Sequence, residues 1–483
     1  MALMRNFTWL ALGEGIGRVV AFGVALYLAR VLGAQQFGLL GSAFALVTYF
    51  GIFVVGGIDY KGVRDIARTP GAISDIVRVN TIAHFVCLAV VYAVLGALLA
   101  FTPIAPQGDV GLVAVYALLL LAMAFNTAWA LRAVEDMRTI ALGAALTWGT
   151  YAILLLALVR DADTPLALVA AAQVAGEFLE VAFFYVVLRR RGVRLVGPFA
   201  WREVFATIRE ALGIMFGRIP RMVYLFGDVL LLAWLASAAA AGEFLASHRL
   251  VLTFVAVGIL IRSAILPQVS QLALASAPAA GRMQMDALRN EWLFFAPAWV
   301  CCWVYAEPLV ELLFGAEFLP SAAVLRWMLL TVPIVGLSFA LQDLLAVVHR
   351  DRVYIGANTL AMLVHIAIAW LLIGSQGALG AAFAAIVAEA LGAALLFLWR
   401  DRDILPARLL GKPLRVLGGA GAMLAAMALL TAWPIWAVVP LGAAVFAATV
   451  LALRAVSLAD LREMREAVWA LASPAGPAER VAK

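Results

Sequence analysis

The run ALGEGIGR at residues 11–18 places two charged side chains inside an apolar stretch long enough to cross a membrane. An ionisable residue at membrane depth costs about 2.5–3.5 kcal/mol on insertion scales, so it faces a protein interior or a wet cavity and is a functional candidate. Glu14 and Arg18 are four residues apart and share one helical face, where they can form an ion pair. Because Gly13 and Gly17 are also four apart, a purely structural role in close helix packing is the alternative.

A related run, ALGIMFGR at residues 211–218, repeats five of these residues at a constant offset, so the chain looks like two halves built on one plan. Arg218 returns here without a glutamate partner, and Arg221 follows three residues later with Pro220 between them. Proline interrupts a helix, and two guanidiniums beside a broken helix suit the oxygens of a phosphate. The alternative is that both arginines reach lipid headgroups at the cytoplasmic end of the helix.

Other ionisable residues in apolar runs form a second group of candidates. Arg249 and Arg262 are further candidates for binding a phosphate, although Arg262 also suits a side chain that reaches the membrane interface. Acidic residues can bind a coupling cation or proton, or balance the charge of cavity arginines. This set, with Glu14, consists of Glu177, Glu180, Asp228, Asp343 and Glu389. His365 alone is more typical of helix packing than of a proton relay.

The composition excludes a soluble globular domain, because 65% of the residues are hydrophobic, 13% are charged and the mean hydropathy is +1.02. We predict an all-α, polytopic membrane protein, since apolar runs of about 20 residues can each span the hydrocarbon core as a helix. The three cysteines do not show the spacing of a disulfide framework or of a metal site, and no cofactor is predicted. The predicted spans lie near 8–30, 38–58, 79–101, 111–131, 140–159, 165–188, 211–235, 246–266, 291–313, 322–346, 353–373, 378–399, 415–433 and 436–454.

Lysines and arginines gather in alternate loops, which places both termini in the cytoplasm. Topology then explains the formal charge of +6, and nucleic-acid binding is not predicted. Six spans in each half predict parallel repeats with a cavity between two lobes. The predicted domains are a first lobe with a basic linker at 1–205, a second lobe at 206–405, two further helices at 406–456, and an amphipathic cytoplasmic tail at 457–483.

Two segments carry a resemblance to a known family. The first is VLGAQQFGLLGSAF at residues 31–44, followed by GGIDYKGVRDIAR at 56–68, and the second is LLFGAEFLPSAAVLRWMLL at 312–330. They resemble the first hairpin, and the turn between spans nine and ten, of the bacterial polysaccharide-transport family. That family comprises O-antigen and exopolysaccharide flippases of the multidrug/oligosaccharidyl-lipid/polysaccharide exporter superfamily.

The resemblance implies a V-shaped bundle of two six-helix lobes that moves polyprenyl-pyrophosphate-linked oligosaccharides to the outer leaflet by alternating access. It places the chain in the bacterial inner (plasma) membrane, in lipopolysaccharide or exopolysaccharide biosynthesis. It implies membrane lipids and polysaccharide polymerase and ligase machinery as partners, and we expect a monomer. On this reading Arg18, Arg218 and Arg221 bind the pyrophosphate.

Three alternatives stay open at this point. A peptidoglycan-precursor flippase also has fourteen spans and cavity arginines, whereas a cation-coupled drug exporter normally has twelve spans and an acidic cavity. A membrane enzyme would need a loop domain or a catalytic motif. The sequence contains no large extramembrane segment, no nucleotide-binding glycine loop and no HExxH, so a transporter is predicted rather than an enzyme.

Overall fold

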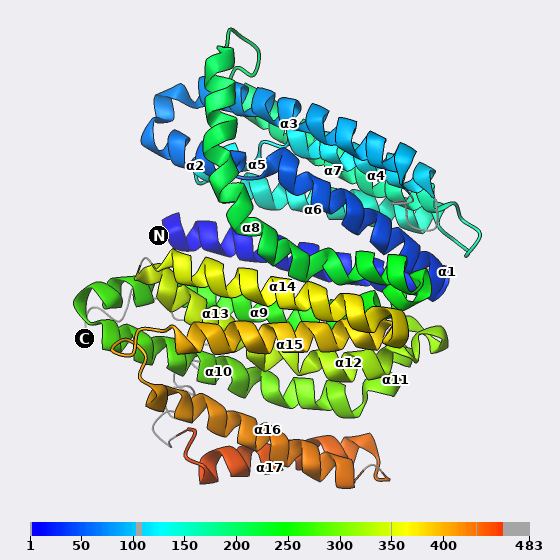
Figure 1. The fold of residues 1–483 in the computed structure, drawn as a ribbon, viewed down its shortest axis with the longest axis vertical. Coiled ribbons are helices and arrows are strands. Elements are labelled where there is room, and N and C mark those ends of the chain that lie inside the picture. The colour runs from blue at the N-terminus through cyan, green and yellow to red at the C-terminus, as the bar shows by residue number, and fades with distance from the viewer. Residues whose placement is uncertain (1, 103–108, 349, 431, 457–483) are drawn as a thin grey trace. The chain divides into compact units, whose positions relative to one another are not determined.

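The computed structural model describes residues 2–102, 109–348, 350–430 and 432–456, with the side chains of 2–14, 16, 217–218, 220–226, 263–264 and 351 left out. These residues form helices joined by short turns and loops (Figure 1). The predicted tail at 457–483 lies outside the described residues. The α-helices are α1 (Ala2–Val55), α2 (Ile58–Arg68), α3 (Ile73–Phe101), α4 (Val110–Phe125), α5 (Ala128–Ala133), α6 (Met137–Leu158), α7 (Leu166–Arg190), α8 (Trp201–Leu235), α9 (Ala238–Ala275), α10 (Ala277–Val304), α11 (Ala306–Phe314), α12 (Ser321–Leu329), α13 (Thr331–Val347), α14 (Asp351–Gln376), α15 (Ala378–Leu398), α16 (Gly411–Leu429) and α17 (Ile435–Ala452).

Ten helices in the described part of the chain are long and apolar enough to cross a membrane, or eleven if the bent pair α10 and α11 forms one span. The chain is therefore a multi-pass membrane protein. Each of the fourteen predicted apolar runs overlaps a helix, but the count of fourteen membrane spans is not confirmed.

Three predicted spans contain breaks that the hydrophobic pattern did not indicate. The run at 111–131 is interrupted at Asn126, which is extended and whose side chain accepts a hydrogen bond from the backbone N–H of Ala128 at 2.8 Å. The run at 291–313 bends by 84° between α10 and α11. The run at 322–346 is divided between α12 and α13. Such breaks depend on tertiary contacts and on polar caps rather than on apolar periodicity.

Helix α1 is broken at Gly33, where φ is +74° and ψ is 174°. This backbone conformation suits glycine, because a Cβ strains the left-handed region. At about 1.5 Å per residue, 54 residues of helix are far longer than the hydrocarbon core of about 30 Å. The break at Gly33 divides α1 into a hairpin, as the two separate apolar runs predict.

The Gly33 turn is held by the segment that joins α11 to α12. The backbone N–H of Ala34 donates to Oε1 of Glu317 at 2.9 Å, and Nε of Arg30 donates to the carbonyl of Leu313 at 2.9 Å. Phe37 packs edge-on against Phe318 with ring centroids 6.1 Å apart. The two sequence segments that carried the family resemblance therefore contact each other directly. We call this set of contacts the Gly33 junction.

The chain forms two compact units, and each unit is made of three segments that alternate along the sequence. Unit 1 contains residues 1–253, 307–331 and 355–392, and unit 2 contains residues 254–306, 332–354 and 393–483. In unit 1 the two halves of α1 pack against α4, α6 and α8, and α7 packs against α4 and α6. In unit 2, α16 packs against α10 and α17. The predicted lobes at 1–205 and 206–405 stay a prediction.

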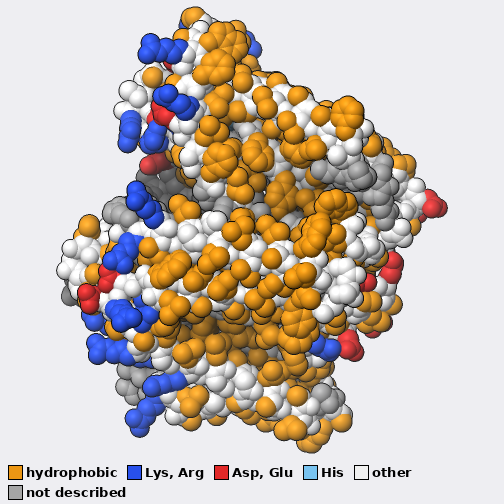
Figure 2. Space-filling view, viewed as in Figure 1, with side chains coloured by type: hydrophobic (Ala, Val, Ile, Leu, Met, Phe, Trp, Pro, Cys, Tyr) orange, Lys and Arg blue, Asp and Glu red, His pale blue; other side chains and the backbone are white. Residues whose placement is uncertain are grey.

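Large apolar side chains lie exposed along the helices, as expected where lipid replaces water. Figure 2 shows hydrophobic side chains over the visible helix faces, with lysines and arginines at helix ends. Leu371 on α14 and Ile153 on α6 are among the most exposed of these residues. Trp201 packs against Phe199 and Phe205 with ring centroids 5.2 and 6.0 Å away, at the start of α8. Such aromatic groups are typical of membrane–water interfaces.

Candidate binding cavity

Unit 1 contains a cavity that encloses about 920 Å³ of empty space, its open mouth included. Helices α1, α4, α6, α7, α8 and α9 line it, so both sides of the Gly33 turn contribute to the wall. The segments of α1 and α9 that reach it are held close by glycines. A Cβ on Gly38 would lie 1.8 Å from the carbonyl oxygen of Ala238, and one on Gly242 would lie 2.0 Å from that of Ala34. These glycines allow the two backbones to touch.

The wall of this cavity is rich in aromatic rings. Phe44 and Tyr116 meet edge-on with centroids 5.7 Å apart, and Trp148 lies 6.3 Å from Tyr151. Phe37 adds a fifth ring to the lining. Tyrosine and tryptophan present a flat apolar face together with one polar atom, so they can pack against a ring while donating a hydrogen bond.

Among the described residues that line the cavity, one is an arginine: Arg249 on α9. Its charge interacts with the side chains of Tyr116 and Tyr151. Within the described part of the chain, no carboxylate lies within ion-pair distance of Arg249, and no Asp or Glu lines the cavity. Arg249 is half-buried, and a guanidinium partly shielded from water without a carboxylate partner is costly, so an anion that enters the cavity compensates part of that cost. The arrangement therefore favours an anionic ligand.

A buried His–Asp pair lies next to this wall. Nε2 of His365 on α14 is 2.8 Å from Oδ1 of Asp228 on α8, and the two residues are 1% and 3% exposed. Asp228 immediately precedes Val229, which lines the cavity. Glu389 on α15 acts electrostatically on His365, and Asp228 acts on His248 of the cavity wall. Asp228, one of the predicted acidic candidates, thus lies next to the cavity wall and is paired with His365.

The arginines favoured by the sequence repeat lie elsewhere or are not described. Arg18 has an exposed side chain and is not among the described cavity-lining residues. It follows Gly17, where a Cβ would lie 3.0 Å from Trp148 of the cavity wall, so Arg18 is near that wall without lining it. The side chains of Glu14, Arg218 and Arg221 lie outside the described residues.

The remaining candidates are distributed over both units. In unit 1, Glu180 accepts a hydrogen bond from Asn126 at 3.3 Å, and Glu177 is half-buried one turn earlier on α7. In unit 2, Arg262 pairs with Glu291 at 2.6 Å, and Asp343 accepts from Gln284 at 3.0 Å. The Arg262–Glu291 pair could not be predicted from the sequence, because it joins residues 29 apart on two helices.

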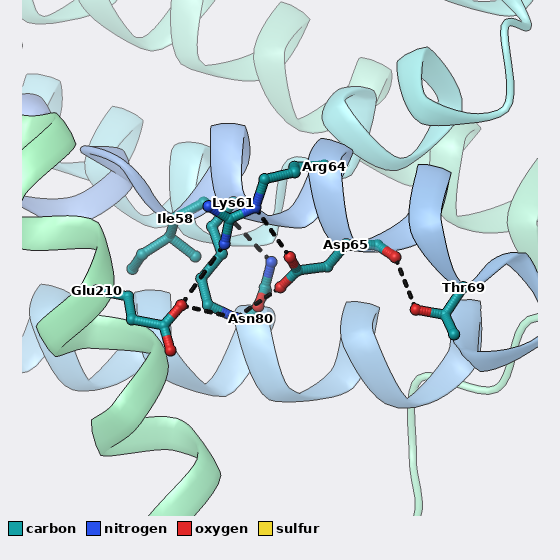
Figure 3. Close-up of polar contacts among 7 residues, drawn as sticks. All are labelled: Ile58, Lys61, Arg64, Asp65, Thr69, Asn80 and Glu210. Carbon is teal, nitrogen blue, oxygen red and sulfur yellow. Dashed lines mark hydrogen bonds and ion pairs between the residues drawn. The ribbon is translucent and has the colours of Figure 1, made fainter.

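Polar residues at the far end of the first hairpin connect α2 to α8 within unit 1 (Figure 3). Nζ of Lys61 lies 2.6 Å from Asp65 and 3.9 Å from Glu210, and Arg64 lies 3.6 Å from Glu210. Asn80 on α3 donates to the carbonyl of Ile58 at 3.3 Å. These contacts tie the amphipathic helix α2 to the start of α8, and they involve a motif that the resemblance singled out.

Most of the cavity wall could not be predicted from the sequence. Tyr116, Trp148 and Tyr151 lie within apolar runs and are indistinguishable by pattern from aromatic residues that face lipid. Arg249 was a candidate, although the repeat gave more weight to Arg218. The available signal was a charged residue near the start of the predicted span at 246–266.

Comparison with solved structures gives similar folds at low sequence identity. A lipid II flippase, MurJ, in an inward closed conformation matches with a TM-score of 0.73 and 14% identity, covering 92% of this chain and 97% of the other. An inward-facing multidrug resistance MATE family transporter of the MOP superfamily matches with a TM-score of 0.63 and 14% identity, covering 81% and 93%. A MOP superfamily transporter from Pyrococcus furiosus matches with a TM-score of 0.53 and 15% sequence identity, covering 82% of this chain and 94% of the other.

Comparison at the level of sequence identifies the family to which the chain belongs. No curated protein sequence matches the chain. The model of the family described as polysaccharide biosynthesis protein matches residues 3–273, which is more than half of the 483 residues. This match includes the first hairpin that carried the resemblance and the cavity residue Arg249. The chain therefore belongs to the polysaccharide biosynthesis protein family, and its fold is similar to those of a lipid II flippase and of a MATE family transporter.

Proposed function

We propose that this protein is a flippase that moves a polyprenyl-pyrophosphate-linked oligosaccharide from the cytoplasmic to the outer leaflet by alternating access. The observation that carries the proposal is Arg249, a guanidinium within an aromatic cavity whose described lining contains no carboxylate. The fork of N–H donors on arginine matches the oxygens of a phosphate. Tyr116, Trp148 and Tyr151 offer flat faces and hydrogen-bond donors for the adjoining sugar rings. The prenyl chain stays in the lipid.

The charge of the cavity decides between this function and drug export. A cationic drug gains from carboxylates and is repelled by a guanidinium, so Arg249 opposes that substrate class. The precursor carried by a lipid II flippase is a closer alternative, because one of the similar folds is that of such a flippase. The two lipid substrates are therefore separate arms of the experiment below.

The membrane arrangement that we propose has fourteen spans and both termini in the cytoplasm of a bacterial inner membrane. The eleven candidate spans become fourteen if α1 crosses twice at the Gly33 break and if α8 and α16 also cross. Two six-helix lobes would then be followed by α16 and α17. The basic residues at helix ends support this orientation.

The other predicted residues have secondary roles in this proposal. Arg18, near the cavity wall, would meet the pyrophosphate as it enters, together with Arg218 and Arg221. The acidic residues Asp228 and Glu389 would balance charge beside the cavity, as would Glu14, Glu177 and Glu180. A monomer would deliver the lipid to polymerase and ligase machinery for a lipopolysaccharide or exopolysaccharide.

The proposal is tested by headgroup translocation of a fluorescent polyprenyl-pyrophosphate oligosaccharide in proteoliposomes. Losing a hydrogen-bonded charge costs about 1.5–3 kcal/mol, so Arg249→Ala should slow translocation about 10- to 150-fold. Arg249→Lys should retain part of the rate. Arg326→Ala is the matched control, because Arg326 in unit 1 pairs with the exposed Glu307 outside the cavity.

Three outcomes oppose the proposal in different ways. Equal rates for Arg249→Ala and the control would remove Arg249 from the binding site. Translocation of lipid II alone would assign the chain to the peptidoglycan pathway. Export of a cationic dye, with no translocation of either lipid, would replace the flippase by a drug exporter.

A further inference from the structure

Unit 2 contains a cluster of charged side chains that takes no part in the cavity. Arg262 on α9 and Glu291 on α10 are 6% and 7% exposed, and their Nη1 and Oε2 atoms are 2.6 Å apart. The guanidinium also lies over the ring of Phe339, 4.7 Å from its centroid. A side chain that reaches the membrane interface would not be enclosed in this way, so Arg262 is an interior residue.

Two glycines make room for the carboxylate of Glu291. A Cβ on Gly258 of α9 would lie 2.4 Å from its Oε1, and a Cβ on Gly336 of α13 would lie 3.3 Å from the same atom. The first distance is shorter than real Cβ contacts, so glycine is needed at 258. The fold therefore accommodates a carboxyl group between three helices, with one oxygen on Arg262 and the other against the two glycines.

A second carboxyl group joins the cluster from α13. Asp343 accepts a hydrogen bond from Nε2 of Gln284 at 3.0 Å, and Gln284 is fully buried. Asp343 also interacts electrostatically with both Arg262 and Glu291. Among the described residues, Oε1 of Gln284 and Nε1 of Trp292 have no hydrogen-bond partner. The cluster thus contains a buried acceptor with capacity for one more hydrogen.

The charges of this cluster do not balance. Two carboxyl groups face one guanidinium, which leaves one negative charge if both are ionised. The neighbouring basic residues are engaged elsewhere, because Arg289 lies 3.5 Å and Lys412 3.8 Å from Asp286 on a different face of α10. Glu291 is 7% exposed and Asp343 is half-buried, and a carboxylate held largely away from water without a partner charge is costly and instead takes up a proton.

We propose that Glu291 and Asp343 form a binding site for one exchangeable proton, with Arg262 holding the charge of the deprotonated state. Binding converts one carboxylate into a carboxylic acid, and release returns the proton to water. The new O–H group would donate to Oε1 of Gln284. A metal ion at this place would lie beside a guanidinium 2.6 Å from Glu291, which opposes a second cation. Resting on the flippase function proposed above, this proton is the coupling ion.

The first test needs no substrate. Infrared spectroscopy of the protein in lipid detects the carbonyl band of a protonated carboxylic acid as the pH is varied. We expect a titrating band in the native protein that disappears in Asp343→Asn or in Glu291→Gln. Asp343→Asn is nearly isosteric, and its amide oxygen can still accept from Gln284. Asp286→Asn, which removes an exposed acid from α10, is the control and should leave the band intact.

Contrary results are distinct from a failure of the flippase assignment. A band that survives both substitutions, or that sodium removes at constant pH, would overturn the proton site whatever the substrate. The second test imposes a pH gradient on proteoliposomes. Translocation should respond to the gradient in the native protein and in Asp286→Asn but not in Asp343→Asn. A titrating band combined with an equal gradient response in all three proteins would overturn the coupling role.

Discussion

The Gly33 junction gives a quantitative prediction about how the cavity opens. The junction joins the hairpin turn of α1 to the segment between α11 and α12, and these segments belong to different halves of the sequence. In an alternating-access cycle such a contact must form in one state and break in the other. Removing one of its hydrogen bonds should therefore shift the equilibrium toward the state in which this end is open.

Glu317→Ala removes the acceptor of the Ala34 backbone N–H. A typical hydrogen bond contributes about 0.5–1.5 kcal/mol, and one to a charged group contributes about 1.5–3 kcal/mol. Because Glu317 is an exposed residue, we expect about 1–1.5 kcal/mol, near the boundary of these ranges. The population of the open state should rise about 5- to 13-fold while it remains the minor state. Glu317→Gln keeps an acceptor and should give a smaller rise.

The assay is the rate at which a buried cysteine is modified. Ala238 is fully buried where α9 touches Gly38, so Ala238→Cys reports opening of this contact. Cys87, Cys301 and Cys302 are first replaced by serine, and a membrane-impermeant maleimide is added. The rate should rise by the factor given above in Glu317→Ala. Glu311→Ala, which removes an exposed acid from α11, is the control. Equal rates in Glu317→Ala and Glu311→Ala would refute the gating role.

Three further predictions concern charge and packing in unit 1. Burial raises the pKa of Asp136, but hydrogen bonds from Thr139 and the charge of Arg191 outweigh burial and lower it below its usual value. As the N-cap of α6, Asp136 should contribute about 0.5–2 kcal/mol above its unfolded pKa. Asp136→Ala should therefore lower the melting temperature at pH 7, with a difference that shrinks as acid protonates Asp136 in the native protein. Gly242→Val should reduce folded yield in detergent size-exclusion runs, because its Cβ would lie 2.0 Å from a carbonyl oxygen, whereas Gly421→Val meets open space and should not. Asp228→Ala should lower the melting temperature more than Asp228→Asn does, since the asparagine can still hydrogen-bond His365; equal losses would contradict this.

Apolar periodicity predicted the helices well, because each run of about 20 apolar residues has one stable solution in lipid. Their breaks were harder to predict. Gly33 is one of 39 glycines in the sequence, and its positive φ follows from the turn that Glu317 stabilises. The bend between α10 and α11 lies just before Glu307 and Pro308 in the first turn of α11, and the prediction of one continuous span at 291–313 overlooked these two residues.

The candidate site was predicted in kind but not in position. Ionisable residues in apolar runs were the signal that made Arg249, Asp228 and Asp343 candidates, and their roles stay predictions. Which of these residues share a site depends on contacts between helices that are far apart in the sequence. A single amino-acid sequence does not reveal those contacts. The repeat favoured Arg218 for its sequence symmetry, whereas the described cavity is lined by Arg249 and by aromatic residues with no distinguishing pattern.

The interleaving of the two units has a consequence for synthesis. Unit 1 is complete only after residue 392 has been made, because its last segment is 355–392. His365 follows Asp228 by 137 residues, so at about 5–20 residues per second roughly 7–27 s of translation separate the two partners. If α8 crosses the membrane as proposed above, it does so during that interval with an aspartate that has not yet met its histidine. In that topology a chain stopped before α14 would leave Asp228 without the partner that it has in the complete fold.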